Sequence, residues 1–268
     1  IKKFFNLLFI CISSKIDLGV SVGSFLLGSA LKLLGKHNIQ FDDDPESFKN
    51  AFLEKLTCTE LFYPPLIKPY GKIKTMNALK EWAYLSPKYL KPNKQELNKY
   101  NLTPKQYIFI REVSTGSLYY RDQSPNIIAE IANKLPSDYI VLLSLEDKTT
   151  IKKYPSDWIL LEEPIEDIHS LIYYSKIVIS SGDSMAREGA MLGVPSIYCG
   201  IRNMRANTIM IDKGMLVKAN PNKAAKLVKS IIIGEIKFEN QVIFREKLIY
   251  EWDDITEFII KQIMKYKN

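Results

Sequence analysis

Cysteine and histidine are scarce in this chain of 268 residues, which holds three cysteines and two histidines. Cys11, Cys58 and Cys199 are odd in number and share no spacing typical of metal ligands. The chain is therefore a poor candidate for a zinc protein or for a disulfide-rich secreted domain. We expect it to bind no metal and to work in a reducing, cytoplasmic compartment.

Long apolar runs and runs of like charge are also missing. The most apolar stretch near the start covers residues 4–12 and is far shorter than the about 20 residues that a membrane span needs. It predicts an amphipathic helix, which allows at most peripheral contact with the inner face of a membrane. The net charge of +7 comes mostly from scattered lysines, so it does not indicate a nucleic-acid-binding surface.

What is present is the composition of a globular protein, with 46% hydrophobic and 25% charged residues. The length fits two domains better than one. Strands such as Tyr139–Leu143 are continuous apolar runs, which is typical of a parallel sheet covered by helices on both faces. The pattern predicts strands over 16–22, 39–41, 61–63, 107–111, 139–144, 158–160, 177–180 and 196–198, and helices over 23–34, 48–57, 126–134, 167–175, 184–192 and 222–232.

In such α/β sheets, ligands bind at the carboxyl ends of the strands. The clearest candidate follows the strand 177–180, where Gly182, Asp183, Ser184 and Met185 lead into a helix. A glycine turn before a helix N-terminus favours an anion, and Glu188, one turn further on, can accept hydrogen bonds from a sugar. The alternative is that Asp183 or Ser184 only caps the helix.

A second junction places Arg111 at the end of a strand, ahead of Ser114, Thr115 and Gly116. Arginine suits phosphate because its guanidinium group forms two parallel hydrogen bonds. The alternative is a surface ion pair between Arg111 and Glu112.

Two further junctions leave more than one interpretation open. His169, near the start of a helix that follows Pro164, is either catalytic or a residue that caps or packs. Asp42, Asp43 and Asp44 follow a strand. Three interpretations of this acidic segment are open: a metal site, a catalytic base, or a solvated turn that starts a helix.

Several of these segments together resemble an uncharacterised prokaryotic family of domain-of-unknown-function proteins. That family is distantly similar to the non-hydrolysing UDP-N-acetylglucosamine 2-epimerases and to GT-B glycosyltransferases. The resemblance covers nearly the whole chain in order, and it is carried by residues 41–44, 82–87, 164–169, 171–174, 182–188, 192–195 and 254–259.

The resemblance implies an α/β fold of two Rossmann-like domains with parallel sheets, facing a cleft. Residues 1–85 would form a partial acceptor-side domain, 86–234 the nucleotide-sugar-binding domain, and 235–268 a helical segment that crosses back. Related chains carry further β/α units before Lys15. We therefore expect the N-terminal domain to be incomplete, and we expect activity only if the native gene supplies the rest.

The resemblance also implies roles for the candidate residues. The diphosphate would face the helix start from Gly182 to Met185, Glu188 would bind the ribose, and the base would lie near Ile165. The predicted nucleotide-sugar site comprises Arg111, Ser114, Thr115, Gly116, Ile165, His169, Gly182, Asp183, Ser184, Met185 and Glu188, and the predicted catalytic residues are Asp43, Asp44, Arg111 and His169. One departure is that Asp183 and Ser184 stand where the epimerases have two glycines, and an acid there would repel a diphosphate unless it caps the helix.

These observations predict a nucleotide-sugar-dependent glycosyltransferase of surface glycan or polysaccharide biosynthesis. A UDP-sugar would be its substrate, a glycan or a lipid-linked molecule its acceptor, and no cofactor would be needed. The alternatives are an enzyme similar to the UDP-sugar 2-epimerases and a protein that binds a nucleotide sugar without catalysis.

Overall fold

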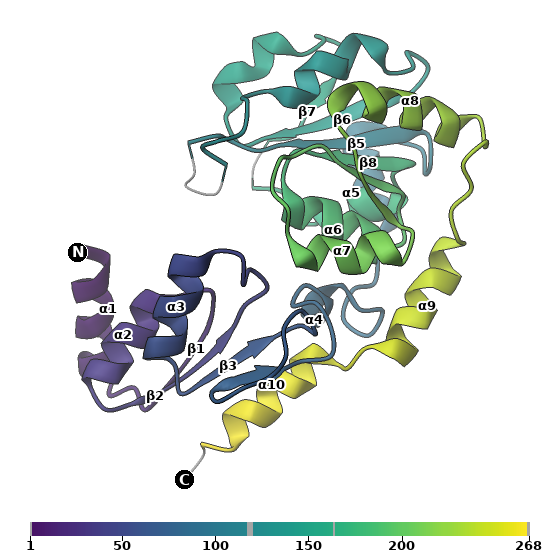
Figure 1. The fold of residues 1–268 in the computed structure, drawn as a ribbon. Helices are drawn as coiled ribbons and strands as arrows, with labels where there is room; N and C mark the ends of the chain where they lie inside the picture. Colours follow the sequence, from purple (N-terminus) through teal and green to yellow (C-terminus); the bar gives the residue numbers. More distant parts are fainter. Residues whose placement is uncertain (1, 117–119, 163, 267–268) are drawn as a thin grey trace. The chain divides into compact units, whose positions relative to one another are not determined.

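The computed structural model describes residues 2–116, 120–162 and 164–266; Ile1 and Asn268, which the predicted domain ranges include, lie outside the described residues. The chain divides into two compact units, each with its own parallel sheet (Figure 1). One unit comprises Ile1–Ser86, Met204–Ala206 and Leu248–Asn268, and the other Pro87–Asn203 and Asn207–Lys247. The predicted α/β class with two parallel sheets is confirmed.

The N-terminal unit is built on a four-stranded sheet in which neighbouring strands follow one another in the chain. Its strands are β1 (Leu18–Val22), β2 (His37–Phe41), β3 (Glu60–Tyr63) and β4 (Ile73–Thr75), and its helices are α1 (Lys2–Ser13), α2 (Phe25–Leu33), α3 (Phe48–Thr57), α4 (Trp82–Leu85) and α10 (Ile255–Met264). Phe258 of α10 packs edge-on against Phe41 and Phe62, with ring centroids 6.5 and 5.3 Å apart. The last helix therefore completes the core of this unit.

The C-terminal unit is built on a six-stranded sheet with the order β10-β9-β8-β5-β6-β7. Its strands are β5 (Tyr107–Glu112), β6 (Ile140–Leu145), β7 (Ile159–Leu160), β8 (Ile177–Ser180), β9 (Ser196–Tyr198) and β10 (Leu216–Lys218). The helices that follow or join them are α5 (Ile168–Tyr174), α6 (Asp183–Met191), α7 (Arg205–Asp212), α8 (Pro221–Ile232) and α9 (Gln241–Glu251), with the 3₁₀ helices η1 (Lys94–Tyr100), η2 (Ile127–Lys134) and η3 (Lys148–Lys153).

Both faces of the larger sheet are buried, as its apolar strands predict. Ile108 and Ile110 pack into one cluster with residues of η2 and α8. Tyr107 and Phe109, which alternate with them, are buried on the opposite face, where the Tyr107 hydroxyl donates a hydrogen bond to the carbonyl of Leu171 in α5. An alternating strand could not have satisfied both layers.

Several elements differ from the prediction or were absent from it, and α4, α7, η1 and η3 are among those not predicted. The segment predicted as a helix over 126–134 is the 3₁₀ helix η2. β4 and β10 were not predicted, because three residues are too few to show a period. No helix among the described residues is long and apolar enough to cross a bilayer.

The order of the larger sheet determines where a ligand site is expected. From β5 the chain runs outward through β6 and β7, then returns to the other side of β5 and runs outward through β8, β9 and β10. The direction in which the chain adds strands reverses between β5 and β8. Open α/β sheets bind ligands at such a switch point. Arg111 of β5 is the register partner of Ser180 of β8, so two predicted junctions lie side by side here.

Candidate functional site

The turn between β8 and α6 is held by its own serines. Ser180 Oγ accepts a hydrogen bond from the Gly182 amide at 3.0 Å and donates one to the Gly182 carbonyl at 2.7 Å. Ser181 Oγ accepts a bond from the Val113 amide at 2.9 Å. A Cβ on Gly182 would lie 2.5 Å from Val113 Cγ1, so a larger residue would have to displace that side chain. The first amides of α6 are thereby fixed at the carboxyl edge of the sheet, where they favour an anion.

Asp183 is neutralised by a neighbouring cation. Its Oδ1 accepts hydrogen bonds from the Tyr120 hydroxyl at 2.6 Å and from the Ser184 amide at 2.9 Å, while its Oδ2 pairs with Arg202 at 2.7 Å. The residue that precedes the helix is Gly182, so the alternative in which Asp183 or Ser184 is the N-cap is wrong. Sequence reasoning missed Arg202 and Tyr120, because both lie in loops with no motif of their own.

Arg111 is paired with an acid further along the chain. Its guanidinium group donates to Ser144 Oγ and to Glu146 Oε1, each at 2.7 Å. Glu146 Oε2 also accepts a hydrogen bond from the Ser114 amide at 2.9 Å, so one carboxylate positions both the arginine and the loop after β5. The alternative pairing with Glu112 is not the one observed: Glu112 is buried, which raises the pKa of its carboxyl group.

A hollow of about 460 Å³ opens at this edge. It is lined by Arg111, Pro164, Ile165, Ile168 and Met185. Three of these residues, Arg111, Ile165 and Met185, were predicted from separate parts of the sequence. One cation beside four apolar side chains suits a ligand that combines a flat, weakly polar ring with an anionic group.

His169 and Glu188 form a pair, with His169 Nε2 lying 3.2 Å from Glu188 Oε2. The N-cap of α5 is Asp167, whose carboxylate accepts a hydrogen bond from the Ser170 amide at 2.9 Å, so His169 is not the cap. Both members of the pair remain partly exposed. The structure thus brings together an imidazole and a carboxylate that the sequence placed in different motifs.

The three predicted residues of the loop after β5 do not line the hollow of about 460 Å³. Ser114 and Thr115 line a separate hollow of about 30 Å³, together with Asp147 and Thr150. That volume accommodates little more than a water molecule. Gly116 is exposed.

Asp43 and Asp44 belong to the N-terminal unit and are buried, at 3% and 8% exposure. The interpretation of this segment as a solvated turn is therefore wrong. Asp43 forms an ion pair with Lys80. Glu54 belongs to the same acidic cluster. Its burial is the main cause that raises its pKa to about 9, and the charge of Asp42 is the second. The described residues contain no group of three or more histidine, cysteine or acidic side chains placed to hold a metal.

The chain is similar to a protein family and to a curated protein. The family model described as "Protein of unknown function (DUF354)" matches residues 74–268. An uncharacterised protein of Methanocaldococcus jannaschii is 23% identical over 148 residues, which are 55% of this chain and 40% of the relative. The chain thus spans about two fifths of the length of that curated relative.

Solved structures share the fold over nearly the whole chain. The UDP-GlcNAc 2-epimerase of M. jannaschii, in complex with UDP-GlcNAc and UDP, has a TM-score of 0.71 at 15% identity, over 98% of this chain and 80% of that one. The glycosyltransferase VinC, in complex with dTDP, has a TM-score of 0.59 at 12% identity, over 98% of this chain and 75% of that one. The predicted likeness to epimerases and GT-B glycosyltransferases is confirmed at the level of fold.

Proposed function

We propose that this chain, which belongs to the family described as "Protein of unknown function (DUF354)" and has a GT-B-like fold, acts on nucleotide sugars as a glycosyltransferase. The observation that carries the proposal is the hollow at the switch point of the larger sheet, where Arg111 and the start of α6 meet apolar side chains. Structural neighbours in complex with UDP, UDP-GlcNAc or dTDP support a nucleotide ligand.

In the proposed complex, the diphosphate lies against the amides from Gly182 to Met185 and against Arg111. The base lies among the apolar side chains around Ile165. Glu188 accepts hydrogen bonds from the ribose hydroxyls, and its partner His169 stays within reach of the same group. Arg202 supports this arrangement because it neutralises the one carboxylate at the helix start.

Transfer of a sugar develops negative charge on the departing diphosphate. Groups that already point at that charge stabilise the transition state without rearranging. The guanidinium of Arg111, held by Ser144 and Glu146, and the amides of α6, fixed by the Ser180 turn, are such groups. They are the proposed source of catalysis in the C-terminal unit.

The acceptor is proposed to be a glycan or a lipid-linked molecule, and its hydroxyl group needs a base. Asp43 and Asp44 remain the proposed candidates. Asp43 forms an ion pair with Lys80, and both carboxylates are buried. Unchanged turnover in both Asp43→Asn and Asp44→Asn would remove the assignment.

Calorimetric titration with UDP, UDP-sugars, GDP-sugars and CMP-sialic acid tests the proposal. We expect UDP and at least one UDP-sugar to bind. A chain that binds none of the four would be neither a transferase nor a nucleotide-sugar-binding protein of the proposed kind. Binding of UDP without turnover on any acceptor would leave the non-catalytic role.

A 2-epimerase is the second candidate, favoured by the higher TM-score of the epimerase, 0.71 against 0.59 for the transferase. The two activities differ in their need for an acceptor. Incubation with UDP-GlcNAc alone, followed by proton NMR, should give the C2 epimer if the chain is an epimerase. A transferase should leave the sugar unchanged until an acceptor is added.

A further inference from the structure

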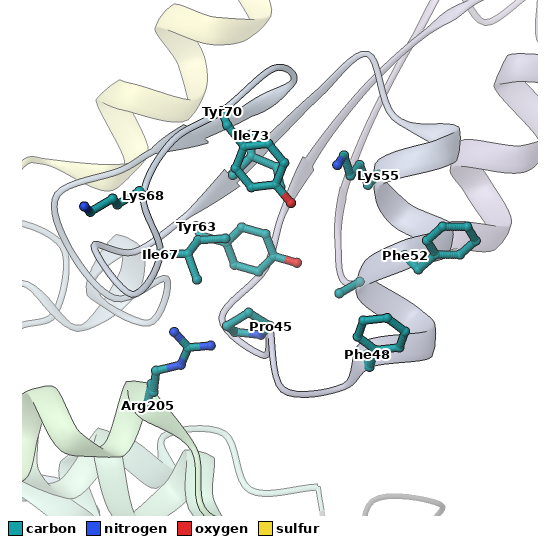
Figure 2. Close-up of a pocket in the computed structure, with 11 residues that line it drawn as sticks. Pro45, Phe48, Phe52, Lys55, Tyr63, Ile67, Lys68, Tyr70, Ile73 and Arg205 are labelled. Atoms are coloured by element: carbon teal, nitrogen blue, oxygen red, sulfur yellow. The ribbon is translucent and has the colours of Figure 1, made fainter.

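A hollow of about 520 Å³ is lined by residues of the N-terminal unit, none of which lines the candidate nucleotide site (Figure 2). Its volume is in the range of small-molecule sites. The residues that line it are Pro45, Phe48, Ala51, Phe52 and Lys55 from α3 and the segment before it, Tyr63 of β3, Ile67, Lys68 and Tyr70 from the following loop, Ile73 of β4, and Arg205. Figure 2 shows the rings of Tyr63 and Tyr70 extending from that loop side toward α3.

The rim of this hollow is apolar and exposed. Phe48 is 80% exposed, and Phe52 and Tyr70 are each 55% exposed. Leu53 and Leu56, which lie on α3 with Phe48 and Phe52, are exposed as well. Large apolar side chains gathered around a concave surface mark a place where a ligand or a membrane covers them.

The charge at the hollow is of one sign. Lys55, Lys68 and Arg205 line it. Arg205 is paired with Glu46 at 2.6 Å, whereas Lys55 Nζ lies 4.4 Å from the centroid of the Tyr70 ring. Among the described residues that line it there is no carboxylate and no amide side chain. A free sugar is held by several polar groups, acceptors among them, so it matches this lining poorly. A ligand with a long apolar part and one anionic group matches both the rings and the ammonium groups.

We infer that this hollow binds the phosphate end of an anionic membrane lipid with an unbranched or isoprenoid chain. Lys55 and Lys68 bind the phosphate, and the chain lies against Phe48, Phe52 and Ile67. That this lipid is the carrier of the sugar acceptor rests on the proposed transferase function.

Calorimetric titration of the full chain with farnesyl monophosphate, below its critical micelle concentration, tests the inference. We expect saturable binding, at least tenfold weaker binding of farnesol, and no measurable binding of inorganic phosphate. Equal affinity for farnesol would overturn the role of the lysines, and equal affinity for inorganic phosphate would overturn the role of the apolar chain. Flotation with phosphatidylcholine vesicles should require undecaprenyl phosphate in the bilayer, and no difference between the vesicles would overturn the assignment to a membrane lipid.

Two pairs of variants locate the site. Lys55→Ala and Phe52→Ser should each weaken farnesyl phosphate binding by about tenfold, the usual effect of losing one charged hydrogen bond or one apolar ring. Lys49→Ala, on the same helix, and Leu33→Ser, on α2, change exposed residues that do not line the hollow. They should leave the affinity unchanged, and equal losses in both pairs would contradict the site.

UDP titrations of the same samples separate this inference from the proposed function. UDP should bind Phe52→Ser as tightly as it binds the unmodified chain. If UDP binds and farnesyl phosphate does not, the lipid site is wrong and the nucleotide site stands. If only farnesyl phosphate binds, the lipid site stands without the transferase.

Discussion

The two sheets of this molecule differ in how the acids at their carboxyl ends are accommodated. In the C-terminal unit two acids are paired with cations, Asp183 with Arg202 and Glu146 with Arg111. In the N-terminal unit Asp43 is paired with Lys80, but Asp42, Asp44 and Glu54 interact with one another, and the pKa of Glu54 is raised to about 9. The carboxyl edge of the C-terminal sheet, the first edge, can therefore accept an anionic ligand. At the carboxyl edge of the N-terminal sheet, the second edge, the carboxyl group of Glu54 keeps its proton instead. The same parallel architecture gives either result, because the residues at the strand ends decide.

Replacing Arg111 should produce the largest change at the first edge. Arg111→Ala should lower turnover of a UDP-sugar by about 10²–10³-fold, because a preorganised donor to the diphosphate is lost. Steady-state kinetics checks this, with Arg121→Ala as the control, since the Arg121 side chain is largely exposed. Unchanged turnover in Arg111→Ala would remove the electrostatic role.

Removing the partner of Asp183 should destabilise the C-terminal unit. Arg202→Ala leaves a carboxylate that is 2% exposed without its cation, and we expect a loss of about 3 kcal/mol in the free energy of unfolding in urea. Adding Asp183→Asn to this variant should restore much of the loss, because no unpaired charge remains. A double variant as unstable as Arg202→Ala would show that the ion pair does not matter.

The buried carboxyl groups at the second edge should make the free energy of unfolding depend on pH. Folding raises the pKa of Glu54 from its usual 4.5 to about 9, so across this window the folded chain holds a proton that the unfolded chain releases. Stability contributed by the protonated group is complete below about pH 4.5 and falls as the pH rises, with a slope of up to about 1.4 kcal/mol per pH unit.

Glu54→Gln should make that slope shallower, as measured by urea unfolding between about pH 5 and pH 8. Some slope should remain, because burial also raises the pKa of Asp42. Glu246→Gln, at an exposed position on α9, controls for the loss of one charge. An identical slope in Glu54→Gln and the unmodified chain would contradict the buried, protonated carboxyl group.

The smallest effect is expected from replacing Glu188, the residue proposed to bind the ribose. Glu188→Gln should weaken UDP binding by about tenfold, since a hydrogen bond to a charged acceptor is lost. Calorimetry with UDP and 2′,3′-dideoxy-UDP gives the control. The unmodified chain should prefer UDP, and the variant should bind the two nearly equally. A preference that persists in the variant would place the ribose elsewhere.

Much of the first edge could be predicted from the sequence. Arg111 lies near the end of an apolar strand and the segment from Gly182 to Met185 follows another, and strands of a parallel sheet end at the same edge. Ile165 was added through the resemblance and lines the same hollow. Arg202 and Glu146 were missed, because the partner of a charge depends on which loops meet in space and not on the local pattern.

The second edge shows where local reasoning fails. Three consecutive aspartates before a proline are typical of a solvated turn, yet Asp42, Asp43 and Asp44 are buried. Glu54, from the far end of α3, reaches the same cluster, and a helical pattern alone does not show that. Burial of these acids is a property of the tertiary packing, so only the structure could reveal it.

Methyl NMR with UDP tests the central claim most directly, which is that a nucleotide binds at the switch point of the larger sheet. In a sample labelled at isoleucine and methionine methyl groups, saturating UDP should shift the signals of Ile165, Ile168 and Met185, which line the hollow. The signal of Ile39, in the core of the N-terminal unit, should stay in place. Shifts confined to the N-terminal unit, or no shift at Ile165, Ile168 and Met185, would contradict the account.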